Sequence, residues 1–247
     1  MRRNIVLGLL LLATAIASNA SGAGIWMISA RQPCTGMTAG FAKPLAELDK
    51  AVGPHWQAAP GPVKGSGLVL VFIAACPNSS FGGKATGKFS SAFVLVPVEQ
   101  SAPAGAQTHA IAVLQAAGKS RASVMQLFRN HGIPVTDAKV SLVVRGLADG
   151  KQAVSIIHTT NGTLTLDAHM EPVTQPMNST DTTAVRVAPP GMLFNGPESS
   201  TRYAKGKAEM RADARSWLQR YQLGTPLFVT VDTDFIWNFQ FTEMPHH

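Results

Sequence analysis

Two histidines and an aspartate in one stretch of the chain, His158, Asp167 and His169, could bind a metal ion or transfer a proton. Two imidazoles and one carboxylate form the ligand set of many non-haem metal sites, and a histidine oriented by a carboxylate can act as a general acid or base. An enzyme built on these residues would perform hydrolytic or lyase chemistry. The same residue types are ordinary on a strand face that contacts only water, and this second interpretation is the more frequent one.

A predicted hairpin would bring the three side chains to one surface. The pair Asn161-Gly162 lies between two alternating runs and is typical of a two-residue type I′ turn with Thr160 opposite Thr163. In that register Asp167 is a diagonal neighbour of His158, at ~7–8 Å between backbone positions. The other face of the hairpin is apolar and should face the core; it carries Ile157, Leu164, Leu166, Ala168 and Met170.

A glycine-rich segment resembles the start of a phosphate loop but lacks its decisive residue. Gly82 and Gly87-Lys88 have the right spacing, yet Phe89 stands where a magnesium-binding serine or threonine is needed. The following residues also have a strand pattern, where a phosphate loop requires a helix N-terminus. The segment is therefore predicted to be a glycine-rich connection between two strands.

Cys34 and Cys76 are the only cysteines of the chain. Neither has a second cysteine nearby, so the sequence disfavours a zinc or redox motif and predicts one disulfide between the two. Such a bond closes a loop of about 40 residues and stabilises the fold by roughly 2–4 kcal/mol.

The N-terminal segment has the pattern of a secretory signal peptide. Two arginines precede an apolar run over 5–17, and the small residues Ser18 and Ala20 suit a cleavage site. The run has about 13 residues, whereas a helix that crosses a bilayer needs ~20. The sequence therefore predicts a cleaved signal over 1–20 and one β-rich exported domain over 21–247, periplasmic or secreted, with no transmembrane segment after cleavage. An uncleaved N-terminal anchor is the alternative.

Composition excludes several classes of protein. Of 247 residues, 45% are hydrophobic and only 14% charged, which rules out a disordered chain or a coiled coil. The net charge is +7, but the basic residues are scattered and not interleaved with stacking aromatics. A nucleic-acid platform is therefore not expected.

Short apolar runs bounded by turn residues predict a mainly β fold, with α+β as the alternative. We expect an antiparallel β-barrel or sandwich of about nine strands with two or three helices packed outside. The predicted strands cover 67–75, 92–98, 109–115, 139–147, 152–160, 163–171, 183–187, 226–231 and 236–241. The predicted helices cover 43–52, 121–131 and 203–223.

These features favour an exported protein that binds a small, partly apolar ligand. Four aromatic residues on predicted strands, Phe72, Phe93, Trp237 and Phe239, are the candidate pocket lining. The alternatives are the exported hydrolase or lyase on the His158, Asp167 and His169 face, with or without a metal, and a purely structural envelope component. No motif identifies a cofactor, and the oligomeric state does not follow from the sequence.

Overall fold

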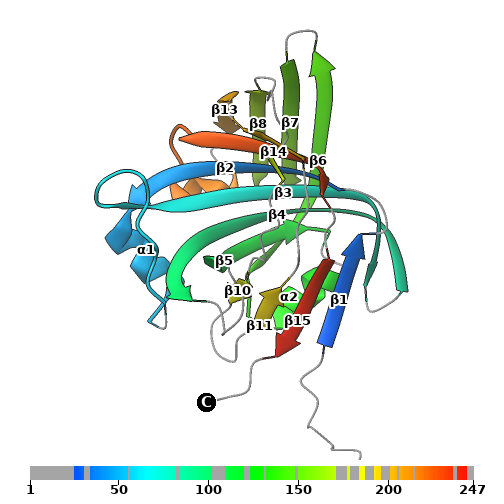
Figure 1. Cartoon of the computed structure of the whole chain (residues 1–247), viewed down its shortest axis with the longest axis horizontal. Helices are drawn as coiled ribbons and strands as arrows, with labels where there is room; N and C mark the ends of the chain where they lie inside the picture. Colours follow the sequence, from blue (N-terminus) through cyan, green and yellow to red (C-terminus); the bar gives the residue numbers. More distant parts are fainter. Residues whose placement is uncertain are drawn as a thin grey trace, which may run out of the picture.

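The computed structural model describes most of the chain from residue 25 onward (Figure 1). The described residues are 25–30, 34–54, 56–81, 84–101, 109–119, 123–130, 132–147, 150–170, 177–178, 184–186, 192–195, 201–204, 206–213, 215–235 and 238–243. They form 15 strands, two α-helices and one 3₁₀ helix. The predicted signal peptide lies outside them. No helix in these ranges is long and apolar enough to cross a membrane.

Four long antiparallel strands form the centre of the molecule. They are β2 (Cys34–Pro44), β3 (Ser66–Phe81), β4 (Lys84–Ser101) and β5 (His109–Gly118), each paired with the next. Figure 1 shows β2, β3 and β4 as long, strongly curved ribbons. The centres of β3 and β4 carry buried β-branched residues at alternate positions, which suits strands inside the fold; they are Val69, Val71, Ile73, Val94, Val96 and Val98.

Pairings beyond β5 lead back to β3. They pass through β10 (Ala184–Arg186), β11 (Met192–Asn195), β15 (Asn238–Glu243) and β1 (Ile25–Ala30), and β1 pairs with the end of β3. This path is compatible with the predicted barrel or sandwich class. On the other side of β2 the order continues through β14 (Phe228–Phe235), β12 (Thr201–Ala204) and β9 (Met177–Asn178).

Four further strands stand together at the top of Figure 1. In order they are β6 (Val135–Leu147), β7 (Gly150–Thr159), β8 (Gly162–Met170) and β13 (Gly206–Ala212). A short parallel pairing of β5 with the start of β6 connects them to the central strands. The mainly β prediction is confirmed, and each of the nine predicted strands overlaps a described strand.

The two faces of the central strands belong to two apolar cores. One core, which we call the large core, contains Val94 of β4, the apolar face of β8, and helix α1 (Leu45–Val52). The other, the small core, contains Phe93 of β4 and helix α2 (Ser123–Asn130). Neighbouring residues of one strand thus point into different cores, as the two-residue period of a strand requires. Both helices overlap predicted ones.

The predicted third helix over 203–223 is wrong. The structure places β12, β13 and a short 3₁₀ helix, η1 (Trp217–Tyr221), in this part of the chain. In β13 Ala208 and Met210 pack against the large core, whereas Glu209 and Arg211 are exposed. This alternation lets the segment pair with the edge of β8, and the pairing outweighs the helical propensity of its residues.

The predicted type I′ turn at Asn161-Gly162 is also wrong. Thr159 lies opposite Gly162, so the two loop residues are Thr160 and Asn161. The Thr159 hydroxyl donates to the Gly162 carbonyl oxygen at 2.9 Å and accepts from the Asn161 N–H at 3.2 Å. These bonds stabilise the observed turn, and they shift the hairpin register by two residues. The predicted core face, which includes Ile157 and Leu164, is confirmed.

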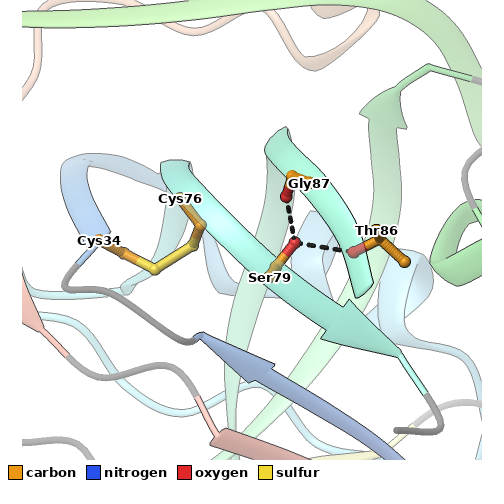
Figure 2. Close-up of a disulfide and its surroundings, with 5 residues drawn as sticks. All are labelled: Cys34, Cys76, Ser79, Thr86 and Gly87. Atoms are coloured by element: carbon orange, nitrogen blue, oxygen red, sulfur yellow. Dashed lines mark hydrogen bonds between the residues drawn. A yellow bond between two sulfur atoms is a disulfide. The ribbon is translucent and has the colours of Figure 1, made fainter. Parts of the chain in front are cut away.

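The predicted disulfide between Cys34 and Cys76 is confirmed (Figure 2). It joins the start of β2 to β3, and both cysteines are buried in the small core. Nearby, the Ser79 hydroxyl bonds the Gly87 carbonyl and the Thr86 hydroxyl across the β3–β4 hairpin, as Figure 2 shows. The described part of the glycine-rich segment, 84–88, belongs to strand β4 and not to a connection, whereas Gly82 and Gly83 lie outside the described residues.

Candidate functional site

Gln115 on β5 is a buried polar residue in an otherwise apolar run, with 3% of its surface exposed. The β4–β5 register shifts between Val94 and Leu95, so that Gln115 lies opposite Val94 and Val113 opposite Leu95. Directly opposed residues share a face of the sheet, and Val94 belongs to the large core. The bulge therefore turns the Gln115 amide toward the large core.

Three side chains satisfy this amide. Gln115 Nε2 donates to Thr136 Oγ1 at 2.5 Å, and Oε1 accepts from the Tyr221 hydroxyl at 3.1 Å. Oε1 also accepts from the Arg220 guanidinium, which donates in addition to the Tyr221 hydroxyl at 2.5 Å. The guanidinium carbon lies 4.7 Å from the centre of the Tyr221 ring. We call these four residues the Gln115 cluster.

The segment that precedes η1 positions Arg220 and Tyr221. The Asp213 N–H donates to the Thr163 carbonyl at 2.8 Å, and the Ser216 N–H donates to the Asp213 carbonyl at 2.7 Å. Gly162 permits this approach, because a Cβ atom there would lie 2.6 Å from the Ser216 nitrogen. We call Asp213, Arg215 and Ser216 the strap. The β7–β8 turn thus fixes the strap, and the strap leads directly into η1.

Arg220 keeps donors available for a ligand. A guanidinium has five N–H groups, and those that bond Gln115 and Tyr221 leave others unused. Arg220 is exposed, and in the described part of the chain no carboxylate lies within ion-pair distance of it. Apolar side chains next to the cluster in sequence, Leu114 and Leu223, are only half-buried. The arrangement offers a positive charge held in a fixed position.

Burial raises the pKa of the Tyr221 hydroxyl, and the hydrogen bond and charge of Arg220 partly oppose that rise. The raised pKa means that Tyr221 adds stability below pH ~10 that is lost at more alkaline pH. The chain has two tyrosines, Tyr203 and Tyr221. We expect absorbance titration of tyrosinate to show one component above the ordinary pKa, which Tyr221→Phe removes. Loss of a component with an ordinary pKa would contradict this assignment.

The hairpin places His158 and Asp167 further apart than the sequence predicts. His158 lies opposite Thr163, whereas Asp167 lies opposite Val154, four residues further along. His158 Nδ1 is 3.1 Å from Thr163 Oγ1, and both His158 and His169 are exposed. On β13 the residue opposite Asp167 is Glu209. Among the residues that the structure describes, no group of three acidic, histidine or cysteine side chains could hold a metal ion.

We expect His158→Ala and His169→Ala each to change the free energy of unfolding by no more than ~0.5 kcal/mol, because exposed strand positions contribute little. Ligand or metal retention should also match that of the unmodified protein. Melting curves and a retention assay on the same two variants test this. Lost retention at unchanged stability would instead support a site on this strand face.

Two of the four predicted pocket residues come together, in the small core. The rings of Phe72 and Phe93 stack with centroids 6.2 Å apart, and Phe93 packs edge-on against Phe128 of α2 at 5.7 Å. They lie on the face of β3 and β4 opposite the Gln115 cluster. Trp237 is outside the described residues. The backbone of Phe239 pairs with Ile28, and its side chain is not among the described parts.

Sequence reasoning missed all four members of the Gln115 cluster. One signal was available, since Gln115 is a polar residue at the end of the apolar strand predicted over 109–115. A buried amide needs hydrogen-bond partners, so such a residue indicates a polar contact inside the fold. Arg220 was expected on the solvated face of the helix that the structure replaces with β12, β13 and η1.

No known family model matches the chain, and no curated protein matches it in sequence. Solved structures do match. An acetoacetate decarboxylase-like enzyme from Sphingomonas wittichii RW1 has 12% identity and a TM-score of 0.60, over 91% of this chain and 94% of that chain. Acetoacetate decarboxylase from Legionella pneumophila subsp. pneumophila has 12% identity and a TM-score of 0.56, over 90% of this chain and 86% of that chain. The enduracididine biosynthesis enzyme MppR has 12% identity and a TM-score of 0.55, over 88% of this chain and 87% of that chain. The chain therefore has the fold of acetoacetate decarboxylase-like proteins.

Proposed function

We propose that the chain is an exported protein that binds a small, partly apolar ligand, and that the Gln115 cluster holds an anionic group of this ligand. The observation that carries the proposal is the fixed guanidinium of Arg220. It is hydrogen-bonded to a buried amide and to a half-buried tyrosine, and it retains unused donors.

Preorganisation makes this arginine a better anion site than an arginine that extends freely into water. Binding orders a long side chain at a cost of about 0.5–1.5 kcal/mol, and a side chain that is already held loses less. The planar guanidinium can bind a carboxylate through two parallel hydrogen bonds. Half-buried Leu114 and Leu223 can contact an apolar part of the same ligand.

The structural neighbours support a small carboxylic acid as the first ligand class to test. Two are named for acetoacetate, and MppR was solved with a condensation product of pyruvate and an imidazole aldehyde. Acetoacetate and pyruvate each combine a carboxylate with a short carbonyl-bearing chain. At 12% identity the shared fold does not carry their reactions to this chain.

The lysine side chains that the structure describes give no support to catalysis through a Schiff base. Enzymes that activate a carbonyl in this way need a lysine amine that is desolvated or lies beside another cation. Among the lysines whose side chains the structure describes, none is buried and none belongs to either core. The alternative of an exported hydrolase or lyase on the His158, Asp167 and His169 face is tested by the histidine variants above.

Export is part of the proposal because two features agree with it. The first is the signal-like N-terminal segment, and the second is the disulfide, a bond that persists mainly in oxidising compartments. Detection of a chain that begins near Ser21 or Gly24 in the periplasm or medium would support export. Full-length chain retained in the cell would contradict cleavage.

Calorimetric titration with acetoacetate, and with the uncharged ketone acetone as the matched probe, tests the ligand class. We expect binding of the acid only, and we expect Arg220→Ala to weaken it by roughly 10- to 100-fold, since a hydrogen bond to a charged group contributes ~1.5–3 kcal/mol. Arg211→Ala is the control, because Arg211 is also exposed but pairs with Glu209 and lies on β13, outside the strap. Equal binding by both variants would contradict the assigned site.

A further inference from the structure

In the group formed by β6, β7, β8 and β13, one long strand edge has no partner among the described residues. The pairing of β5 with β6 ends at Asp137, and from Ala138 to Leu147 strand β6 is paired with β7 on one side only. In Figure 1, β6 stands at the margin of its group of four strands. We call the open side of residues 138–147 the β6 edge.

The β6 edge has little protection against further strand pairing. Its centre, from Val140 to Val144, contains four aliphatic residues, one serine and no charge or proline. The Val143 side chain is 44% exposed, and Leu142 and Val144 are half-buried. The opposite margin of the group is β13, where Glu209 and Arg211 are exposed and charged. Charges of this kind block edge pairing, and the middle of β6 lacks them.

We propose that the β6 edge pairs with the same edge of a second copy of this chain, antiparallel about a two-fold axis at Val143. Val143 then lies opposite its own counterpart, and Leu142 lies opposite Val144 on the other face. Arg145 lies opposite Ser141, so no two like charges oppose each other. An interface of this kind is self-complementary, and backbone hydrogen bonds join the two sheets into one.

Charge and space favour this register over the two that are centred nearer the start of β6. An axis at Leu142 would place Lys139 opposite Arg145, and like charges directly opposite each other destabilise a strand pair. An axis at Ser141 would extend the partner strand to Asp137, where β5 already pairs. The net charge of +7 makes two copies repel each other at long range, so the dimer strengthens as salt screens that repulsion.

Cysteine cross-linking of the purified chain tests the arrangement. Both native cysteines are in the disulfide, so an introduced cysteine is the one free thiol. Directly opposed residues have Cβ atoms about 4.5–5.5 Å apart, and Val143→Cys should therefore form a dimer on mild oxidation. Val63→Cys is the matched control, because Val63 is 46% exposed and lies in the segment between α1 and β3.

Register and affinity are tested separately. A mixture of Ser141→Cys and Arg145→Cys chains should cross-link faster than either variant alone. Val143→Lys places two like charges at the axis and should weaken dimerisation by at least about tenfold in sedimentation velocity, whereas Val63→Lys should not. A monomer at every concentration and salt level, or equal cross-linking of Val143→Cys and Val63→Cys, would overturn the proposal. A dimer that Val143→Lys leaves intact would also overturn it.

Discussion

Gly162→Ala is expected to lower the free energy of unfolding by about 2–6 kcal/mol, from backbone strain of ~1–3 kcal/mol together with an overlap that costs ~1–3 kcal/mol. Gly162 has φ = +133°, where a side chain is strained. Its missing Cβ would also lie 2.6 Å from the Ser216 nitrogen and 2.8 Å from the Arg215 carbonyl carbon. Both neighbours are backbone atoms, so the overlap is relieved only if the strap moves.

Alanine variants at two other glycines separate the contribution of backbone strain from that of the steric overlap. Gly132 has φ = +76° with no atom within 4 Å of its Cβ position, so Gly132→Ala should cost ~1–2 kcal/mol from conformation alone. Gly224 has neither a positive φ nor a close atom, and Gly224→Ala should change stability by no more than ~0.5 kcal/mol. Urea unfolding of the three variants measures the order. Equal losses for Gly162→Ala and Gly132→Ala would show that the strap does not approach Gly162 closely.

The same variant tests how the strap serves the Gln115 cluster. Movement of the strap displaces η1, and with it the contacts of Arg220 and Tyr221 to Gln115. The pKa of Tyr221 should then return toward its ordinary value in the folded variant, because the hydroxyl regains water. Acetoacetate binding should weaken in parallel. A variant that loses stability but keeps both properties would place the strap outside the site.

Strand positions, the core face of the β7–β8 hairpin and the disulfide follow from local sequence signals. Runs of branched apolar residues and a two-residue alternation can be recognised within a few positions of the chain. Two cysteines allow only one pairing. The hairpin register did not follow, because the Asn161-Gly162 signal competed with the Thr159 hydroxyl bonds. The residues of β13 have helical propensity, and only their pairing with β8 decides the strand.

The candidate site depends on contacts between distant parts of the chain. Gln115 and Tyr221 are 106 residues apart, and Gln115 and Thr136 are 21 apart. No periodicity links such positions, and the bulge that turns Gln115 toward the large core is a property of the β4–β5 pair. The sequence can show that Gln115 needs partners, but the fold determines which residues these are.

Loss of the disulfide between Cys34 and Cys76 should lower the free energy of unfolding, because the bond restricts the unfolded chain. Cys34 and Cys76 extend the β2–β3 register in which Thr35 lies opposite Ala75, so the bond crosses two strands that already pair. It closes a segment with a sequence separation of 42 residues, which restricts the unfolded chain far more than the folded one. We expect the double variant Cys34→Ala/Cys76→Ala to lose ~2–4 kcal/mol, and its Tm to fall by roughly 5–15 °C.

Reductant distinguishes this effect from the loss of two buried side chains. The unmodified protein should lose Tm when it is reduced, whereas the double variant should not respond, because it has no disulfide to break. The reduced protein and the double variant should then have similar Tm values. Any remaining difference reflects the two sulfur atoms, which the double variant lacks in the small core. Thiol counting on freshly isolated, denatured protein is the decisive measurement. Two reactive thiols per chain would show that the bond is absent and that β2 and β3 are held by strand pairing and core packing alone.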